Sequence, residues 1–478
     1  MLNSLPRIIV CALKGGSGKT ILSLGITAAW QEQGHTVAPF KKGPDFIDSS
    51  WLAFAAGRPC HNLDPFMMSE DQIIQSFLLN SIDADISLTE GNRGLFDGLD
   101  VEGSCSSAEL ARLIKTPVIL VVDVTMTTRT MAALIMGCQR FDPDLKIGGV
   151  IINRVAGNRQ ASIIRNSIER YCGIPVLGSV PRLKEDIFPE RHMGLVPHRE
   201  RGHAAKGINA VKTIVKENLD LDAIWRIAFE VCSFETGLPL KKDVHTPCKD
   251  SPRIGFVRDN SFWFYYPENL EQLKRLGADL IEVNSISDQK LPDLDALYVG
   301  GGFPETKAQA LSDNRSFRES LKQNIENGLP VYAECGGLIY MGESLIVNND
   351  IYPMTGALPV KFVMGKRPRG HGYTILEVEK ENPFFPAGTS IKGHEFYYSC
   401  PVISHPDKIR SVFRMRRGYG LDGERDGLCV NNMLATYTHL HAGGNEIWGK
   451  NLFLAALRFK KSKKKISQNR VDIVDMEM

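Results

Sequence analysis

The chain has 478 residues, of which 43% are hydrophobic and 23% charged, and its formal net charge is +2. This length exceeds what one hydrophobic core accommodates, so the sequence predicts two or three domains. The near balance of charges argues against nucleic-acid binding. No apolar run approaches the roughly 18 to 20 residues that a membrane span needs. Ten cysteines without a C-x-x-C pair are typical of neither a disulfide framework nor a zinc ribbon, and we expect a cytoplasmic protein.

The first half of the chain alternates short apolar runs with amphipathic segments, which is typical of a parallel sheet flanked by helices. We therefore predict an α/β domain, a doubly wound parallel sheet of the P-loop NTPase type, over residues 1–235. The expected strands are residues 7–13, 36–41, 86–91, 117–124, 147–155 and 175–181, with helices at 21–33 and 108–114.

Between the two halves the periodicity stops. Three prolines and mixed charges predict a linker over residues 236–252. A new alternation of strand and helix patterns then predicts a second α/β domain over residues 253–459. Residues 460–478 form a lysine cluster followed by polar residues, and we expect a disordered tail there.

A glycine-rich stretch, "KGGSGKT", lies between the first expected strand and the first expected helix. In such a loop, glycines let backbone N–H groups turn toward phosphates, Lys19 reaches the β/γ oxygens and Thr20 offers its hydroxyl to Mg²⁺. Leu13 stands where a standard Walker A loop has glycine, so the stretch resembles the deviant loop of dethiobiotin-synthetase and MinD-like ATPases. The predicted ATP-binding residues are Lys14, Gly15, Gly16, Ser17, Gly18, Lys19 and Thr20.

Acidic residues follow the second and third expected strands. Ligands gather at the carboxyl ends of strands in doubly wound sheets, so these loops should face the phosphates. Glu90 follows its strand directly and is the predicted second contact to Mg²⁺, beside Thr20. Asp and Asn are also common turn formers, and that alternative stays open for four further candidates. These are Asp45, Asp48 and Asp97, and Asn153 as a residue that could read the adenine edge.

The second half contains "LPVYAECGGLIYMG", an apolar strand followed by a sharp turn and a helix. Cys335 at the turn has small residues two positions before and after it, which predicts a nucleophile elbow. At a helix N-terminus the partial positive charge favours the thiolate. The N–H group of Gly336 would point toward an oxyanion, and the "GGGFPE" turn would supply a second donor from Gly301 or Gly302. Two histidines, His439 and His441, are candidate bases.

The motifs of both halves resemble one family. "AECGG", "GGGFPE", "RDNSFWFYYPENL" and "YTHLH" resemble a class I glutamine amidotransferase domain. "FKKGPDFIDSSWL", "GRPCHNLDPF" and "EGNRGLFDG" resemble the ATPase domain of the same proteins, the cobyrinate a,c-diamide synthase family.

The resemblance implies an enzyme that uses ATP and Mg²⁺ to activate a tetrapyrrole carboxylate as an acyl phosphate. Cys335, with His439 as its base, would release ammonia from glutamine for the amide. The resemblance also implies that the activated carboxylate is handled by Asp45, Asp48 and Asp97, and that Glu90 lies near the metal.

Three positions depart from the family pattern. His441 stands where many class I glutaminases have Glu, so Cys335 and His439 could act as a pair. Tyr397 replaces a histidine and Thr374 an arginine, which raises the question of which tetrapyrrole is amidated. Siroheme or sirohydrochlorin is the alternative substrate, and a MinD-like ATPase switch is the alternative of another class. The oligomeric state stays open, with a homodimer among the alternatives.

Overall fold

The computed structural model describes residues 5–183, 190–191, 194–195, 204–234 and 250–477. The chain divides into two compact units, Met1–Lys242 and Asp243–Met478. The division falls within the range 236–252 expected for the linker, most of which lies outside the described residues. Each unit is an α/β structure, which confirms the predicted fold class.

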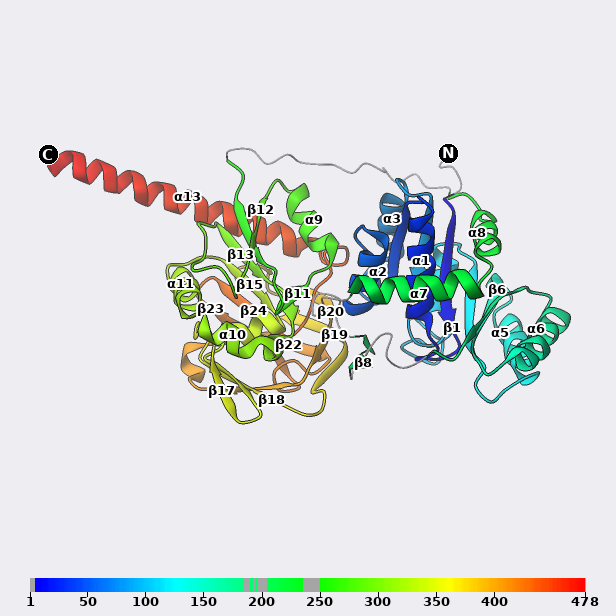
Figure 1. Cartoon of the computed structure of the whole chain (residues 1–478). Helices are drawn as coiled ribbons and strands as arrows, with labels where there is room; N and C mark the ends of the chain where they lie inside the picture. The colour runs from blue at the N-terminus through cyan, green and yellow to red at the C-terminus, as the bar shows by residue number, and fades with distance from the viewer. Residues whose placement is uncertain (1–4, 184–189, 192–193, 196–203, 235–249, 478) are drawn as a thin grey trace. The chain divides into compact units, whose positions relative to one another are not determined.

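The N-terminal unit is built on a seven-stranded sheet of order β3-β2-β4-β1-β5-β6-β7, in which every pair of neighbours is parallel (Figure 1). All six predicted strands are present, and the sequence analysis missed only the short β3. Strands such as β5 are almost wholly buried, as parallel strands covered on both faces should be. The strands are β1 Arg7–Ala12, β2 Val37–Lys42, β3 His61–Leu63, β4 Ile86–Glu90, β5 Val118–Asp123, β6 Ile147–Val155 and β7 Val176–Pro181.

Eight helices of this unit lie within its described residues. Helix α1 packs closely on α7, because Gly25 has no side chain: a Cβ there would lie 2.4 Å from Val215. The helices are α1 Lys19–Glu32, α2 Ile47–Ala56, α3 Glu70–Ser81, α4 Ser107–Leu113, α5 Thr130–Phe141, α6 Asn158–Cys172, α7 Ala204–Asn218 and α8 Leu221–Phe229, and a short strand pair is formed by β8 Glu190–Arg191 and β9 Gly194–Leu195.

The C-terminal unit has a nine-stranded mixed sheet of order β12-β10-β13-β15-β24-β23-β22-β19-β20. The pairs from β12 to β24 are parallel, and those from β24 to β20 are antiparallel. The strands are β10 Arg253–Val257, β12 Asp279–Val283, β13 Ala296–Val299, β15 Val331–Glu334, β19 Gly370–Val378, β20 Ser390–Tyr397, β22 Arg410–Arg417, β23 Arg425–Val430 and β24 Met433–Thr436.

Smaller elements surround this sheet. A four-stranded sheet joins β16 Ser344–Val347, β17 Asp350–Pro353, β18 Val360–Met364 and β21 Ser399–Ile403, and a short antiparallel pair joins β11 Phe262–Phe264 to β14 Gly301–Gly302. The helices are α9 Pro267–Arg275, α10 Ala308–Asp313, α11 Arg315–Glu326, α12 Gly336–Met341 and α13 Glu446–Glu477, with 3₁₀ turns η2 Pro304–Lys307 and η3 Pro406–Lys408.

The expected disordered tail is instead the continuation of α13, so that expectation differs from the structure. The physical reason is visible in the lysine cluster. The Lys460 ammonium donates to the Ser251 carbonyl at 2.6 Å, and Lys463 lies 2.8 Å from a carboxylate oxygen of Asp293 and of Asp295. These lysines therefore hold the helix against its own unit.

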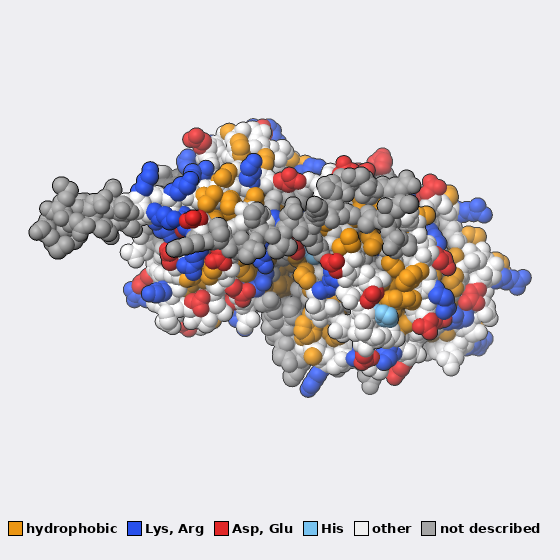
Figure 2. Space-filling model, turned by 90° about the horizontal axis from the view of Figure 1, so that it is seen from above, with side chains coloured by type: hydrophobic (Ala, Val, Ile, Leu, Met, Phe, Trp, Pro, Cys, Tyr) orange, Lys and Arg blue, Asp and Glu red, His pale blue; other side chains and the backbone are white. Residues whose placement is uncertain are grey.

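Charged side chains of both signs are interspersed over the face shown in Figure 2, in keeping with the small net charge. Among the described residues, no helix combines the length and the apolarity needed to cross a bilayer.

Candidate active sites

The phosphate loop follows β1 and leads into α1. Gly16 and Gly18 have φ values of 73° and 93°, the left-handed region that glycine adopts without strain. A Cβ on Gly18 would lie 2.3 Å from Nδ2 of Asn153, whose amide donates to the Ser17 carbonyl at 2.8 Å. Asn153 therefore braces the loop from the end of β6, and its expected contact with adenine stays a prediction.

Lys19, at the start of α1, is almost fully buried and donates to the Arg93 carbonyl at 2.7 Å. Arg93 itself has φ 50°, an uncommon conformation for a residue with a side chain. Lys14, by contrast, has an exposed side chain whose ammonium lies 3.8 Å from Asp123. Gly15 is exposed as well, so the loop presents its backbone to solvent.

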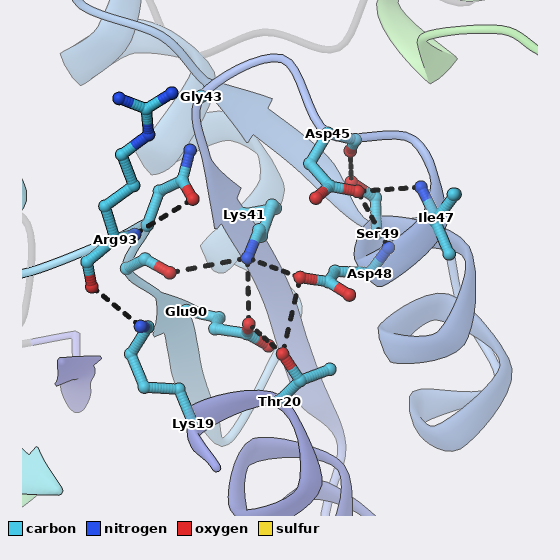
Figure 3. A network of polar contacts seen from close by, with 12 residues as sticks. Lys19, Thr20, Lys41, Gly43, Asp45, Ile47, Asp48, Ser49, Glu90 and Arg93 are labelled. Carbon is cyan, nitrogen blue, oxygen red and sulfur yellow. Dashed lines mark hydrogen bonds and ion pairs between the residues drawn. The ribbon is translucent and has the colours of Figure 1, made fainter. Parts of the chain in front are cut away.

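A buried lysine that the sequence analysis did not single out joins the acidic residues to the loop. The Lys41 ammonium donates to Asp48 at 2.9 Å and to Glu90 at 2.8 Å, and the Thr20 hydroxyl donates to Glu90 at 2.7 Å (Figure 3). Burial opposes the charged form of Lys41, but the two carboxylates raise its pKa above the ordinary value. The sequence contains a signal for this residue, because the fully buried strand β2 ends in two lysines.

Asp45 and Asp97 accept backbone N–H groups, whereas Asp48 pairs with Lys41. One Asp45 oxygen accepts the backbone N–H groups of Ile47 and Asp48, at 2.8 and 2.9 Å, where α2 begins. Burial and the Asp48 carboxylate raise the pKa of Asp45 to about 7. Asp97 is exposed and accepts the N–H group of Gly94 at 2.8 Å, so it shapes the turn after β4.

The donor set around Thr20 fits a hydrated Mg²⁺ ion. Magnesium prefers hard oxygen ligands and commonly binds through one or two carboxylates together with phosphate oxygens. Thr20 lies 2.7 Å from Glu90 and 3.3 Å from Asp48. The second Glu90 oxygen is buried and has no hydrogen-bond partner among the described residues, which leaves it available to a metal or its water. Burial also raises the pKa of Glu90.

Cys335 forms the expected elbow between β15 and α12. Its φ of 47° and ψ of −99° are strained for a residue with a side chain, as a nucleophile elbow requires. Its N–H group donates to the Thr436 carbonyl at 2.8 Å, which ties the elbow to the end of β24. Since Glu334 pairs with Thr436, Cys335 and the segment leading to His439 leave neighbouring strands at the same edge.

The glycine turn lies against this elbow. A Cβ on Gly336 would lie 3.0 Å from the nitrogen of Gly302, and a Cβ on Gly337 would lie 2.4 Å from the Val299 carbonyl. A Cβ on Gly301 would lie 2.3 Å from Cε1 of His439. The structure thus brings together the predicted elbow, the predicted oxyanion donors and one of the two candidate histidines.

The two histidines face different carboxylates. His439 Nδ1 lies 3.4 Å from Glu334, whereas His441 Nε2 lies 3.5 Å from Glu268 on α9. His441 Nδ1 also accepts the N–H group of Gly443, so both of its nitrogens have structural neighbours. The contacts favour His439 as the histidine of the cysteine site.

The resting state of the cysteine differs from the sequence expectation. Burial, followed by the nearby Glu305 carboxylate, raises the pKa of the Cys335 thiol, although the Gly336 N–H group lowers it. Desolvation is the largest of these effects, and it disfavours the thiolate. The thiol, which contacts the Phe396 carbonyl at 3.7 Å, therefore needs a base before it can act as a nucleophile.

The two departures Tyr397 and Thr374 lie inside the C-terminal unit. Tyr397 is 4% exposed and stacks on Tyr437 at 3.6 Å between ring centroids. The Thr374 hydroxyl is fully buried and contacts Thr438 at 3.2 Å. Both side chains are therefore buried, and the suggestion that these positions bear on the choice of tetrapyrrole stays a prediction.

Comparisons with known proteins find a described domain in each half of the chain. Residues 8–196 match the family described as the CobQ/CobB/MinD/ParA nucleotide binding domain, and residues 253–447 match the CobB/CobQ-like glutamine amidotransferase domain. A cobyrinate a,c-diamide synthase of Magnetococcus marinus is 39% identical over 97% of this chain and 99% of its own length. One of Archaeoglobus fulgidus is 40% identical over 91% of this chain and 94% of its own.

Fold, sites and comparisons together define the class: a carbon–nitrogen ligase with glutamine as amido donor, in which a nucleotide-binding domain is joined to a glutamine amidotransferase domain. The chain belongs to the cobyrinate a,c-diamide synthase family.

Proposed function

We propose that the protein amidates carboxylates of a tetrapyrrole at the expense of ATP and glutamine, and that its substrate is cobyrinate, converted to the a,c-diamide in cobalamin biosynthesis. The observation that carries the proposal is the match to relatives of that name across both units, at 39% identity over 97% of the chain. Nine described cysteines are free, which supports a cytoplasmic location.

The N-terminal unit is the proposed synthetase. The backbone of residues 14–18 and the Lys19 ammonium would bind the ATP phosphates. Thr20 and Glu90 would hold Mg²⁺, which would neutralise charge on the transferring phosphoryl group. An oxygen of the substrate carboxylate attacks the γ-phosphorus, and ADP leaves. Asp45, Asp48 and Asp97 are the residues expected to handle the activated carboxylate; Asp48 lies in the first turn of α2. The product of the step is an acyl phosphate.

The C-terminal unit is the proposed glutaminase. His439 takes the thiol proton of Cys335, and the sulfur attacks the side-chain amide carbon of glutamine. The N–H groups of Gly336 and of the Gly301–Gly302 turn donate to the oxyanion. The proton on His439 leaves with ammonia, and water then hydrolyses the thioester to glutamate and free thiol. Ammonia attacks the acyl phosphate and displaces phosphate, which leaves the primary amide.

The experiment that tests the substrate is mass spectrometry of a tetrapyrrole panel after incubation with the enzyme, Mg-ATP and glutamine. The panel contains cobyrinate, hydrogenobyrinate, siroheme, and sirohydrochlorin with and without nickel or cobalt. Each amidation replaces OH with NH₂, and we expect two such replacements on cobyrinate. Amidation of siroheme or sirohydrochlorin with none on cobyrinate would contradict the proposed substrate while keeping the reaction class.

A MinD-like ATPase switch predicts an inert C-terminal unit. The match of residues 253–447 to a glutamine amidotransferase domain argues against it. Complete failure to hydrolyse glutamine with every acceptor of the panel would revive that alternative.

A further inference from the structure

The histidine of the cysteine site needs a partner at the ring nitrogen that faces away from the sulfur. Such a partner fixes the tautomer and stabilises the imidazolium that forms when the thiol proton is transferred. The residue two positions after His439 is His441, which cannot play this part because its Nε2 lies 3.5 Å from Glu268 and its Nδ1 accepts the N–H group of Gly443. The partner must come from elsewhere in the fold.

Glu334, the residue directly before the cysteine, lies in the required place. Its side chain is 1% exposed, and its Oε2 lies 3.4 Å from Nδ1 of His439. Its Oε1 accepts the N–H group of Leu440 at 3.2 Å. The carboxylate thus lies within ion-pair distance of the imidazole of His439 and accepts a hydrogen bond from the backbone that follows it.

Further hydrogen bonds fix the carboxylate itself. The Tyr298 hydroxyl, on the neighbouring strand β13, donates to Glu334 Oε2 at 3.0 Å. Burial, followed by the Glu334 charge, raises the pKa of Tyr298 well above its ordinary value, so the hydroxyl keeps its proton and acts as a donor. Asn269 on α9 donates to Tyr298 Oη at 3.2 Å and to the Leu440 carbonyl at 2.9 Å. The network joins the "PENL" motif to the histidine.

Neighbouring groups also lie against the opposite edge and one face of the His439 ring. A Cβ on Gly301 would lie 3.2 Å from Nε2 of His439, so Nε2 faces the glycine turn of the proposed oxyanion site. The imidazole of His394 stacks on His439 with 4.9 Å between centroids and 21° between planes. Burial lowers the pKa of His394 well below its ordinary value, so this stacked ring is neutral and adds no positive charge.

We propose that Glu334 is the positioning carboxylate of the glutaminase site, taking the place that a glutamate two residues after the histidine holds in many class I enzymes. It keeps the proton of His439 on Nδ1, so that Nε2 receives the thiol proton of Cys335 and returns it to the departing ammonia. This inference rests on the proposed glutaminase function of the C-terminal unit.

The test is Glu334→Gln, which keeps the size of the side chain and removes its charge. We expect kcat for glutamine hydrolysis to fall by about 100-fold or more, since loss of an orienting carboxylate costs up to about 10⁴ in a related triad. KM for glutamine should stay within about twofold of wild type, because the carboxylate contacts the histidine and not the substrate. Amidation with free ammonium should be unchanged.

The matched control is Glu268→Gln, which alters the other buried histidine–carboxylate pair of the same unit. It should leave kcat for glutamine hydrolysis within about threefold of wild type at equal thermal stability. A loss in kcat that is equal in the two variants, or a Glu334→Gln enzyme that retains wild-type kcat, would overturn the proposal.

If Glu334→Gln does not fold, Tyr298→Phe provides the same test with less disturbance. It keeps the ring and removes one hydrogen bond to the carboxylate, so kcat should fall by about three- to tenfold with KM unchanged; an unchanged kcat counts against Glu334. Cys335→Ser distinguishes a failure of the proposed glutaminase function from a failure of the proposed role of Glu334. Glutamine hydrolysis that survives this change would overturn the glutaminase itself, whereas its loss beside a fully active Glu334→Gln overturns only the positioning role.

Discussion

At the scale of single residues, the proposed synthetase site contains Lys41, the buried cation between Asp48 and Glu90. A buried charge is tolerated when it is paired and hydrogen-bonded, and Lys41 also donates to the Gly91 carbonyl at 3.3 Å. Because its carboxylate partners lie beside Thr20, Lys41 sets the geometry of the predicted metal ligands. Asp45 lies next to this cluster, and the charges of the cluster contribute to its pKa.

The raised pKa of Asp45 predicts how the stability of the protein depends on pH. The native state keeps the Asp45 proton up to about pH 7, whereas the unfolded chain releases it near pH 3.8. The contribution of this carboxyl to the free energy of unfolding therefore decreases as the pH rises from about 4 to 7. Asp45→Asn removes this loss while keeping an oxygen that can accept the N–H groups of Ile47 and Asp48.

We expect the stability of wild type, relative to Asp45→Asn, to decrease as pH rises through that window and to level off on either side. Thermal unfolding midpoints of the two proteins across the window measure it. Parallel curves would show that Asp45 titrates as an ordinary exposed carboxyl.

At the scale of elements, the glutaminase site is formed where β14, β15 and the segment after β24 meet. Close approach of backbone to backbone is possible there because the contact positions are glycines. A Cβ on Gly302 would lie 1.9 Å from the Ser261 carbonyl oxygen, and one on Gly337 would lie 2.4 Å from that of Val299. Gly301 instead leaves room for a side chain, the His439 ring.

Gly301→Ala should therefore displace the imidazole, because a Cβ would lie 2.3 Å from Cε1. We expect glutamine-dependent amidation to fall by about 100-fold, comparable to the loss of an oxyanion donor, with ammonium-dependent amidation retained. Gly137→Ala in α5 is the control, since a Cβ there meets nothing within 4 Å and alanine favours a helix. Equal activity of the two variants with glutamine would show that the ring has room to move.

At the scale of the whole molecule, the two chemistries are carried by two units with separate sheets. In the proposed mechanism, the N-terminal unit needs ammonia but no thiol, and the C-terminal unit needs a thiol but no phosphate loop. Substitutions in either unit should therefore have different signatures with the two nitrogen sources.

Cys335→Ser should abolish amidation with glutamine and retain it with ammonium, because a serine hydroxyl at this elbow is a far weaker nucleophile than the thiol. The measurement is amide product by mass spectrometry with each nitrogen source. If ammonium failed to restore product in a folded Cys335→Ser protein, the division of labour would be wrong.

Lys19→Ala should remove amidation with both nitrogen sources, by about 100-fold or more, because the phosphates lose a buried cation. Glutamine hydrolysis assayed without a tetrapyrrole serves as the control for folding of the C-terminal unit. Retained amidation would remove ATP from the mechanism.

The sequence by itself determined the α/β class, the six long strands of the first sheet, the phosphate loop and the cysteine elbow. These features are local: each depends on periodicity, on glycine where φ is positive, or on small residues around a tight turn. The lysine cluster continues helix α13 where the sequence analysis expects a disordered tail, and Lys463 pairs there with Asp293 and Asp295, which lie far away in the chain.

Only the tertiary structure decided how distant residues combine. It placed Lys41 between Asp48 and Glu90, turned His441 toward Glu268, brought Glu334 to His439 and buried Tyr397. It also buried Cys335, and this burial raises the pKa of the thiol. The physical reason is common to all five: burial and pairing of charges depend on neighbours in space, and a linear pattern of residues does not contain them.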